Sequence, residues 1–151
     1  MIEAFWAEFV EATGIDGPYE AWAFGDPSLP DLATELALLV RDGPKRATTG
    51  VVSEYEDEAE KLPEPGDLSA ILDGEGQPVC VIRTTAVEIR RFGVVDEAFA
   101  WDEGEGDRTL EWWRRAHVWF LEQQGIRVDG DTQMVLEHFE LLWPNPADSS
   151  E

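Results

Sequence analysis

Residues 35–50, ELALLVRDGPKRATTG, restrict the possible fold more than any other stretch of this sequence. Apolar residues recur at helical spacing over residues 29–42, and Gly43 followed by Pro44 is a typical end of a helix. β-Branched residues then predict a strand. Lys45 therefore follows a corner whose backbone is fixed by the turn, and its amine is free to point into a cleft.

The composition predicts one globular domain that repels polyanions. The chain has 151 residues and a net charge of -22, with 33 acidic side chains against 11 lysines and arginines. Such a charge disfavours a broad phosphate-binding surface, although it is equally explained by solubility. Eight of these bases fall in three short groups: Arg41, Lys45 and Arg46; Arg90 and Arg91; Arg108, Arg114 and Arg115. If they converge, a confined positive pocket would suit a nucleoside or short single-stranded RNA and not duplex DNA.

No feature of the sequence predicts a membrane partner or an exported protein. No apolar run approaches the roughly 18 residues of a membrane span, and the N-terminal segment MIEAFWAEFV carries acids where a signal peptide is basic. The single cysteine, Cys80, forms no internal disulfide and is expected to be a small buried side chain. We expect a cytoplasmic protein that needs neither a metal nor a cofactor.

Periodicity and turn residues predict a mixture of helices and strands. A first helix ends near Gly14, and a long helix begins after its N-cap Thr109 and ends at Gly125. The other predicted helices are 29–42 and 94–101. The predicted strands are 48–55, 68–72, 79–89 and 134–143, and residues 73–77 form a hairpin loop between the second and third of them.

Several side chains have both a structural and a functional interpretation. Trp22 or Phe24 forms either a stacking wall of a pocket or an aromatic anchor in the core. His117 lies on an apolar helix face, where a core histidine with satisfied hydrogen bonds is the commoner role. The acidic run 54–60 suggests a solvated loop more than a metal site, because adjacent acids imply no ligand geometry.

Lys45, Thr48 and Glu103, with Glu105 as the alternative acid, form the candidate catalytic group. A desolvated lysine can act as a base and activate a threonine hydroxyl as a nucleophile. On an extended strand, however, residues three apart lie on opposite faces. A nearby glutamate would either relay a proton or hold Lys45 charged, and from the residues alone a structural role remains the alternative.

An ordered set of motifs resembles the ASCH family. The matching segments are W-x-F-G-D at residues 22–26, the apolar residues 36–40, G-x-K-x-A-T at 43–48, P-G-D at 65–67, F-A-x-x-E-G-E-G-D at 99–107, L-x-x-W-x-x-x-H at 110–117 and Phe139. The resemblance covers roughly residues 20–143. It leaves residues 1–19 as an N-terminal helix and turn region and 144–151 as a tail.

The resemblance implies an α+β fold with a PUA-like mixed β-barrel and flanking helices. Some small ASCH proteins hydrolyse the acetyl group of N4-acetylcytidine with a lysine, a threonine and a glutamate, which implies catalytic roles for Lys45, Thr48 and Glu103. We expect the ligand to be bound by residues around this group. The candidates are Trp22, Phe24, Asp26, Arg46, Thr49, Glu105 and Arg115.

Two alternatives to amide hydrolysis remain. ASCH proteins nearer this length have been described as nucleases for single-stranded RNA, a function that the net charge disfavours. A non-catalytic module that binds RNA or a modified nucleoside would keep the aromatic and arginine contacts without needing the Thr48 hydroxyl.

Overall fold

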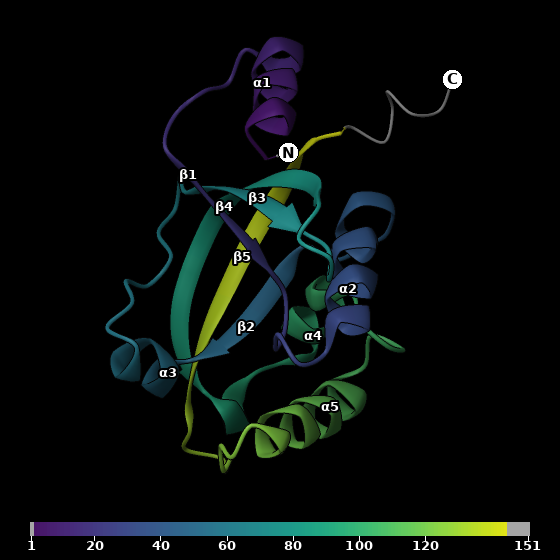
Figure 1. The fold of residues 1–151 in the computed structure, drawn as a ribbon. Coiled ribbons are helices and arrows are strands. Elements are labelled where there is room, and N and C mark those ends of the chain that lie inside the picture. Colours follow the sequence, from purple (N-terminus) through teal and green to yellow (C-terminus); the bar gives the residue numbers. More distant parts are fainter. Residues whose placement is uncertain (1, 145–151) are drawn as a thin grey trace.

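A computed structural model describes residues 2–144, which form one mixed sheet with helices packed around it (Figure 1). The strands are β1 Tyr19–Ala23, β2 Ala47–Val51, β3 Leu68–Leu72, β4 Pro78–Arg91 and β5 Gln133–Trp143. The helices are α1 Ile2–Thr13, α2 Pro30–Asp42, α3 Val52–Asp57, α4 Glu97–Glu103 and α5 Leu110–Gln123, with a short 3₁₀ turn at Phe92–Val94.

The sheet has the order β1-β3-β4-β5-β2 and curls into a half-barrel. β1 runs parallel to β3, and every other neighbouring pair is antiparallel. The long β4–β5 ladder changes register between Val81 and Ile82 and again between Thr84 and Ala86, and such bulges increase local twist. The predicted α+β class and PUA-like arrangement with flanking helices are thus confirmed.

The two faces of the sheet are covered by different helices. We call the face that carries Ile71, Ile82 and Phe139 the inner face; α2 packs on it through Leu36 and Val40. On the outer face, α1 packs against β3 and β4, and α4 and α5 pack against β2 and β5. In Figure 1, α1 lies at the top of the sheet, α2 at its right and α5 at the bottom.

Helix α1 belongs to the same packed body as the rest of the described chain. Trp6 and Phe9 are buried against Ala70 and Val81, and the Phe5 and Trp143 rings lie 5.0 Å apart between centroids. The region beyond Pro144, which the sequence predicts to be a tail, lies outside the described residues. The described helices include none with the length and apolar character that crossing a membrane requires.

Most predicted elements are confirmed, and three need correction. The predicted strand 48–55 ends at Val51, because the following residues VSEYED form α3 despite the β-branched residues that suggested a longer strand. The helix predicted at 94–101 starts later, at Glu97, where the Asp96 side chain caps it by accepting a hydrogen bond from the Phe99 amide at 3.0 Å. Strand β1 was not predicted: it is five residues long, and its parallel pairing with β3 is non-local.

Candidate functional site

Lys45 occupies the corner that the sequence predicts, but its amine is turned inward. Helix α2 ends at Asp42, and Lys45 follows Pro44 with 0% of its surface exposed. Its Nζ donates to the Ala47 carbonyl at 2.8 Å, to Glu105 Oε2 at 2.6 Å and to Glu103 Oε1 at 3.3 Å. An ammonium group has three donors, so these partners satisfy it fully in its charged form.

Glu103 is held by side chains of β2 and α5 in addition to Lys45. Its Oε2 accepts from Thr49 Oγ1 at 2.6 Å and from Trp113 Nε1, while His117 Nε2 lies 3.4 Å away. Burial alone would raise the pKa of Glu103, but the positive charges of His117 and Lys45, with the Thr49 hydrogen bond, lower it to about 2. Glu103 is therefore a carboxylate throughout the physiological pH range.

The glycines of the E-G-E-G segment let the acidic loop lie directly on the lysine corner. Gly104 caps α4 with φ +68°, and a Cβ there would lie 2.8 Å from the Lys45 backbone nitrogen. The Arg46 amide donates to the Asp102 carbonyl at 2.7 Å, which fixes the same contact. Glu105 thereby reaches the Lys45 amine. Burial raises the pKa of Glu105, and the positive charge of Lys45 offsets only part of this rise.

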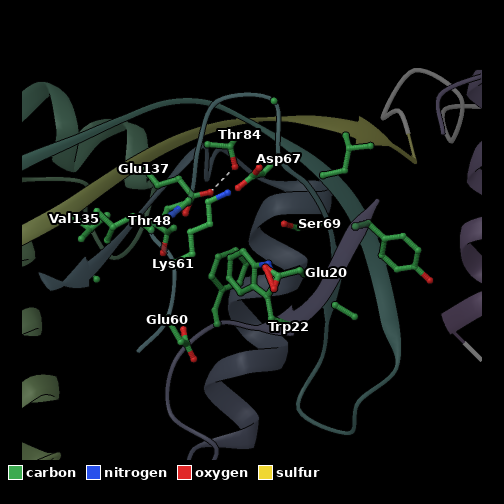
Figure 2. Close-up of a pocket in the computed structure, with 18 of the residues that line it drawn as sticks. Glu20, Trp22, Thr48, Glu60, Lys61, Asp67, Ser69, Thr84, Val135 and Glu137 are labelled. Carbon is green, nitrogen blue, oxygen red and sulfur yellow. Dashed lines mark hydrogen bonds between the residues drawn. The ribbon is translucent and has the colours of Figure 1, made fainter. Parts of the chain in front are cut away.

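A cavity of about 1060 Å³ lies on the inner face beyond the part that α2 covers. The edge strands β1 and β2 both border it, together with residues 60–69. Thr48, Ser69, Thr84 and Glu137 line its sheet side, and Figure 2 shows Trp22 and Glu20 across from Glu137. The lining contains five acids and one lysine, which gives it a negative charge: Asp16, Glu20, Glu60, Asp67 and Glu137, with Lys61.

The structure brings Lys45 and Glu103 together but gives Thr48 different neighbours. Residues alternate along β2, and Thr49 is the hydroxyl that faces Glu103. Thr48 is paired in register with Glu137 and borders the cavity (Figure 2). Within residues 2–144, no hydrogen bond joins Thr48 to Lys45 or Glu103. The catalytic assignment of the three residues stays a prediction.

The predicted aromatic residues are both at the cavity. Trp22 is half-buried in its wall, and its ring meets Phe24 edge-on at 5.0 Å between centroids. Phe24 is buried against Phe139 and also lies 5.2 Å below the Lys45 amine. Phe24 is therefore a core residue that also borders the cavity, and stacking of Trp22 or Phe24 on a ligand stays a prediction.

Besides Glu105, which is bound to Lys45, three predicted ligand-binding residues lie outside the cavity lining. Asp26 accepts from the Ser28 amide at 2.7 Å within its own turn, and that hydrogen bonding lowers its pKa. Arg46 donates to the Val40 carbonyl at 3.0 Å, at the end of α2. Arg115 is exposed and lies 3.8 Å from Glu111. Each has a local structural partner, and ligand binding by these three stays a prediction.

Sequence reasoning did not identify Glu137, Thr84 or Tyr55. Glu137 is 6% exposed, and its Oε2 accepts from Thr84 Oγ1 at 2.7 Å. Burial raises its pKa, and the Thr84 hydrogen bond offsets only part of the rise. Burial, with nearby carboxylates, raises the pKa of Tyr55 to about 12, so its hydroxyl stays protonated at the cavity. The sequence does contain one indication of Glu137: it lies in a mostly apolar strand, on the same face as Val135 and Phe139.

Other candidates for chemistry are less well placed. Cys80 is buried as predicted, and burial raises the pKa of its thiol to about 12, so it is a poor nucleophile. Across residues 2–144, no three His, Cys, Asp or Glu side chains are grouped so that they could hold a metal ion.

Comparison with known proteins identifies a family and solved structures of similar fold. A family model for the ASCH domain matches residues 20–143. Protein EF3133 from Enterococcus faecalis V583, whose crystal structure is known, shares 34% sequence identity with this chain. The two structures superimpose with a TM-score of 0.81, and the match covers 99% of this chain and 94% of EF3133. The crystal structure of an ASCH domain from Lactobacillus crispatus JV V101 is 29% identical, with a TM-score of 0.79 over 93% and 92% of the two chains.

More distant comparison adds only the fold. The structure of hypothetical protein PH0355 is 14% identical, with a TM-score of 0.52 over 82% of this chain and 97% of that one. No curated protein matches the chain significantly.

Proposed function

The chain belongs to the ASCH domain family, and from that premise we propose that it hydrolyses the amide of an acylated nucleoside such as N4-acetylcytidine. The observation that carries the proposal is the position of β2. One side of this strand presents Thr48 to a cavity of about 1060 Å³, and the other side contacts the buried Lys45–Glu103 pair. Acyl transfer needs a hydroxyl nucleophile at a ligand cavity and a base that can reach it, and β2 is the strand that joins Thr48 to the Lys45–Glu103 pair.

In this proposal Thr48 attacks the acyl carbon and the nucleoside nitrogen leaves with a proton. Water then hydrolyses the threonine ester and releases the carboxylic acid. Lys45 is the base for the Thr48 hydroxyl and must first lose a proton; Glu105, 2.6 Å away with a raised pKa, is the group placed to take it. Glu103 stays charged and orients Lys45. Catalytic hydrogen bonds often tighten only in the substrate complex, as the Lys45–Thr48 contact would have to do.

The charge of the cavity favours a free nucleoside over an RNA strand. Five carboxylates and one lysine line the cavity, and the whole chain carries a charge of -22. A phosphate backbone would be repelled, whereas a neutral nucleoside would not. Trp22 offers the base an aromatic surface, and stacking on such a surface contributes roughly 1–3 kcal/mol.

The test is release of cytidine from N4-acetylcytidine and a panel of acylated cytidines. We expect turnover by the wild type, and loss of at least about 100-fold in Thr48→Val and Lys45→Met. Glu140→Gln, on the exposed end of β5, is the matched control and should retain full activity. Because Lys45→Met removes a buried charge, its fold must be checked by circular dichroism before its activity is interpreted.

The other outcomes assign the two alternative functions. Cleavage of labelled single-stranded RNA that Lys45→Met abolishes, without release of cytidine, would identify a ribonuclease. Tight nucleoside binding without turnover, unchanged in Thr48→Val, would identify a binding module. Either result would reject the hydrolase proposal.

A further inference from the structure

Glu137 is a buried carboxylate that the proposed acyl-transfer chemistry does not use. It lies in the middle of β5 and faces the cavity from the inner face, with 6% of its surface exposed. Figure 2 shows its hydrogen bond from Thr84 on the neighbouring strand β4, with Thr48 on its other side. It is therefore held in a fixed position by the sheet.

The protein provides little positive charge for this carboxylate: within residues 2–144 the charge of Lys45 offsets only part of the rise in its pKa. Among residues 2–144 no ion pair includes Glu137, and the lysine in the cavity lining, Lys61, is exposed and pairs with Glu64 at 2.9 Å. Lys45 is engaged by Glu103 and Glu105. Burying a carboxylate without a cation costs stability, and such residues are commonly retained for function.

The chemistry of the carboxylate restricts what it can bind. Oε2 accepts from Thr84, and within the described residues no protein donor is bound to Oε1. An ionised carboxylate only accepts hydrogen bonds, so a ligand group beside it must be an N–H or O–H. A phosphate, a carboxylate or a carbonyl oxygen would be repelled by it. The negative charge of the surrounding lining strengthens that selection.

The register of the strands places this acceptor beside the proposed reacting group. Thr48 and Glu137 are opposite one another in the β2–β5 ladder, so their side chains project from the same face as neighbours. In an N4-acylated cytidine, the acyl carbon that Thr48 would attack is bonded to N4, which carries one N–H. A base with its acyl carbon at Thr48 therefore presents N4–H towards Glu137.

We propose that Glu137 binds the exocyclic N4–H of a cytosine base and makes the cavity select cytosine over uracil. Carboxylates are established acceptors for this group, and uracil presents the O4 carbonyl at the same position. The inference rests on the proposed function in that the ligand is a nucleoside. It adds the residue that distinguishes cytosine from uracil.

The test measures binding of cytidine and uridine, neither of which needs to be hydrolysed. Calorimetry on the wild type should give at least about tenfold tighter binding of cytidine. In Glu137→Gln the preference should fall below about threefold, because a glutamine can turn its amide to donate to O4 as readily as it accepts from N4–H. Glu140→Gln, an exposed acid of the same strand that does not line the cavity, is the control and should keep the wild-type preference.

Each outcome separates this inference from the hydrolase proposal. Equal binding of the two nucleosides by the wild type, no binding of either, or a preference that survives in Glu137→Gln would overturn the role of Glu137. Acetylcytidine turnover alongside such a result would leave the hydrolase proposal intact. Conversely, a cytidine preference that Glu137→Gln abolishes, in a protein without turnover, would support Glu137 and reject hydrolysis.

Discussion

Glu103 and Glu137 are both buried acids beside β2, yet they have different hydrogen-bond and ion-pair partners. Glu103 is contacted by Lys45 and His117 and accepts hydrogen bonds from Thr49 and Trp113. Glu137 accepts one hydrogen bond, from a neutral hydroxyl. The pKa is accordingly lowered in the first and raised in the second. Burial alone does not decide the state of a carboxylate; its partners do.

The difference separates a carboxylate that stabilises the fold from one that is available to a ligand. Each donor on Glu103 comes from the protein, so removing any of these contacts leaves a buried group unsatisfied. Glu137 borders the cavity and is in no ion pair within residues 2–144, so it keeps acceptor capacity that a ligand could use. The comparison predicts opposite effects on stability when each site is neutralised.

The largest expected effect is the loss of the Lys45 charge. Lys45→Met leaves Glu103 and Glu105 buried without their cation and should lower the free energy of unfolding by about 3–5 kcal/mol. The control is Lys61→Met, the other lysine of the chain, which is exposed and should cost less than about 1 kcal/mol. Urea denaturation at pH 7 measures both, and equal effects of the two substitutions would refute the buried ionic cluster.

A smaller effect is expected from Glu103, whose ionisation makes the free energy of unfolding depend on pH in the acid range. Its pKa is about 2 in the folded protein against an ordinary value of 4.5, so the unfolded chain takes up this proton first as the pH falls. The contribution is complete above pH 4.5 and is lost as the pH approaches 2. It amounts to at most about 3 kcal/mol.

Glu103→Gln should remove this part of the pH dependence. Unfolding free energies measured from pH 2 to pH 6 would then change less steeply than in the wild type, from a lower value at neutral pH. Glu140→Gln, a half-exposed pair with Arg83, should leave the slope unchanged. If the unfolding free energy of Glu103→Gln changed with pH as steeply as that of the wild type, the lowered pKa assigned to Glu103 would be wrong.

The smallest effect is expected at Glu137, and it has the opposite sign. Because the folded pKa of Glu137 is raised, its ionisation above that pKa costs stability, and the cost disappears as the pH falls below it. Glu137→Gln removes the charge and keeps an oxygen for Thr84, so stability at pH 7 should be unchanged or higher by up to about 1 kcal/mol. A loss above about 2 kcal/mol in urea denaturation would make Glu137 a structural residue like Glu103.

The sequence was most informative where a local signal and a motif coincided. The Gly43–Pro44 pair correctly predicted the end of the helix just before Lys45. The E-G-E-G segment contains the two acids, Glu103 and Glu105, that contact the Lys45 amine. Lys45 and Glu103 are 58 residues apart, so their contact was predicted from the resemblance and not from spacing. The close approach of Gly104 to Lys45 explains why glycines separate the two acids.

The cavity was less predictable because it depends on which part of the sheet is left uncovered. Strand β5 was correctly predicted, and alternation puts Glu137 on the inner face with Val135 and Phe139. An acid in a strand normally faces solvent, and only the position of α2 reveals that this one faces a cavity. β1, which forms one border, pairs in parallel with β3 across more than 40 intervening residues, and local periodicity carries no information about such a partner.

The two register shifts in the β4–β5 ladder have a consequence for how relatives can diverge. Bulges of this kind bend a strand and increase its twist, and these two lie on interior strands of the curled sheet whose edge strands β1 and β2 border the cavity. Shape and chemistry are thus encoded at different positions. Substitutions at Thr48, Thr84 or Glu137 can exchange one small ligand for another while the curled sheet is inherited unchanged, which is how one fold comes to serve several substrates.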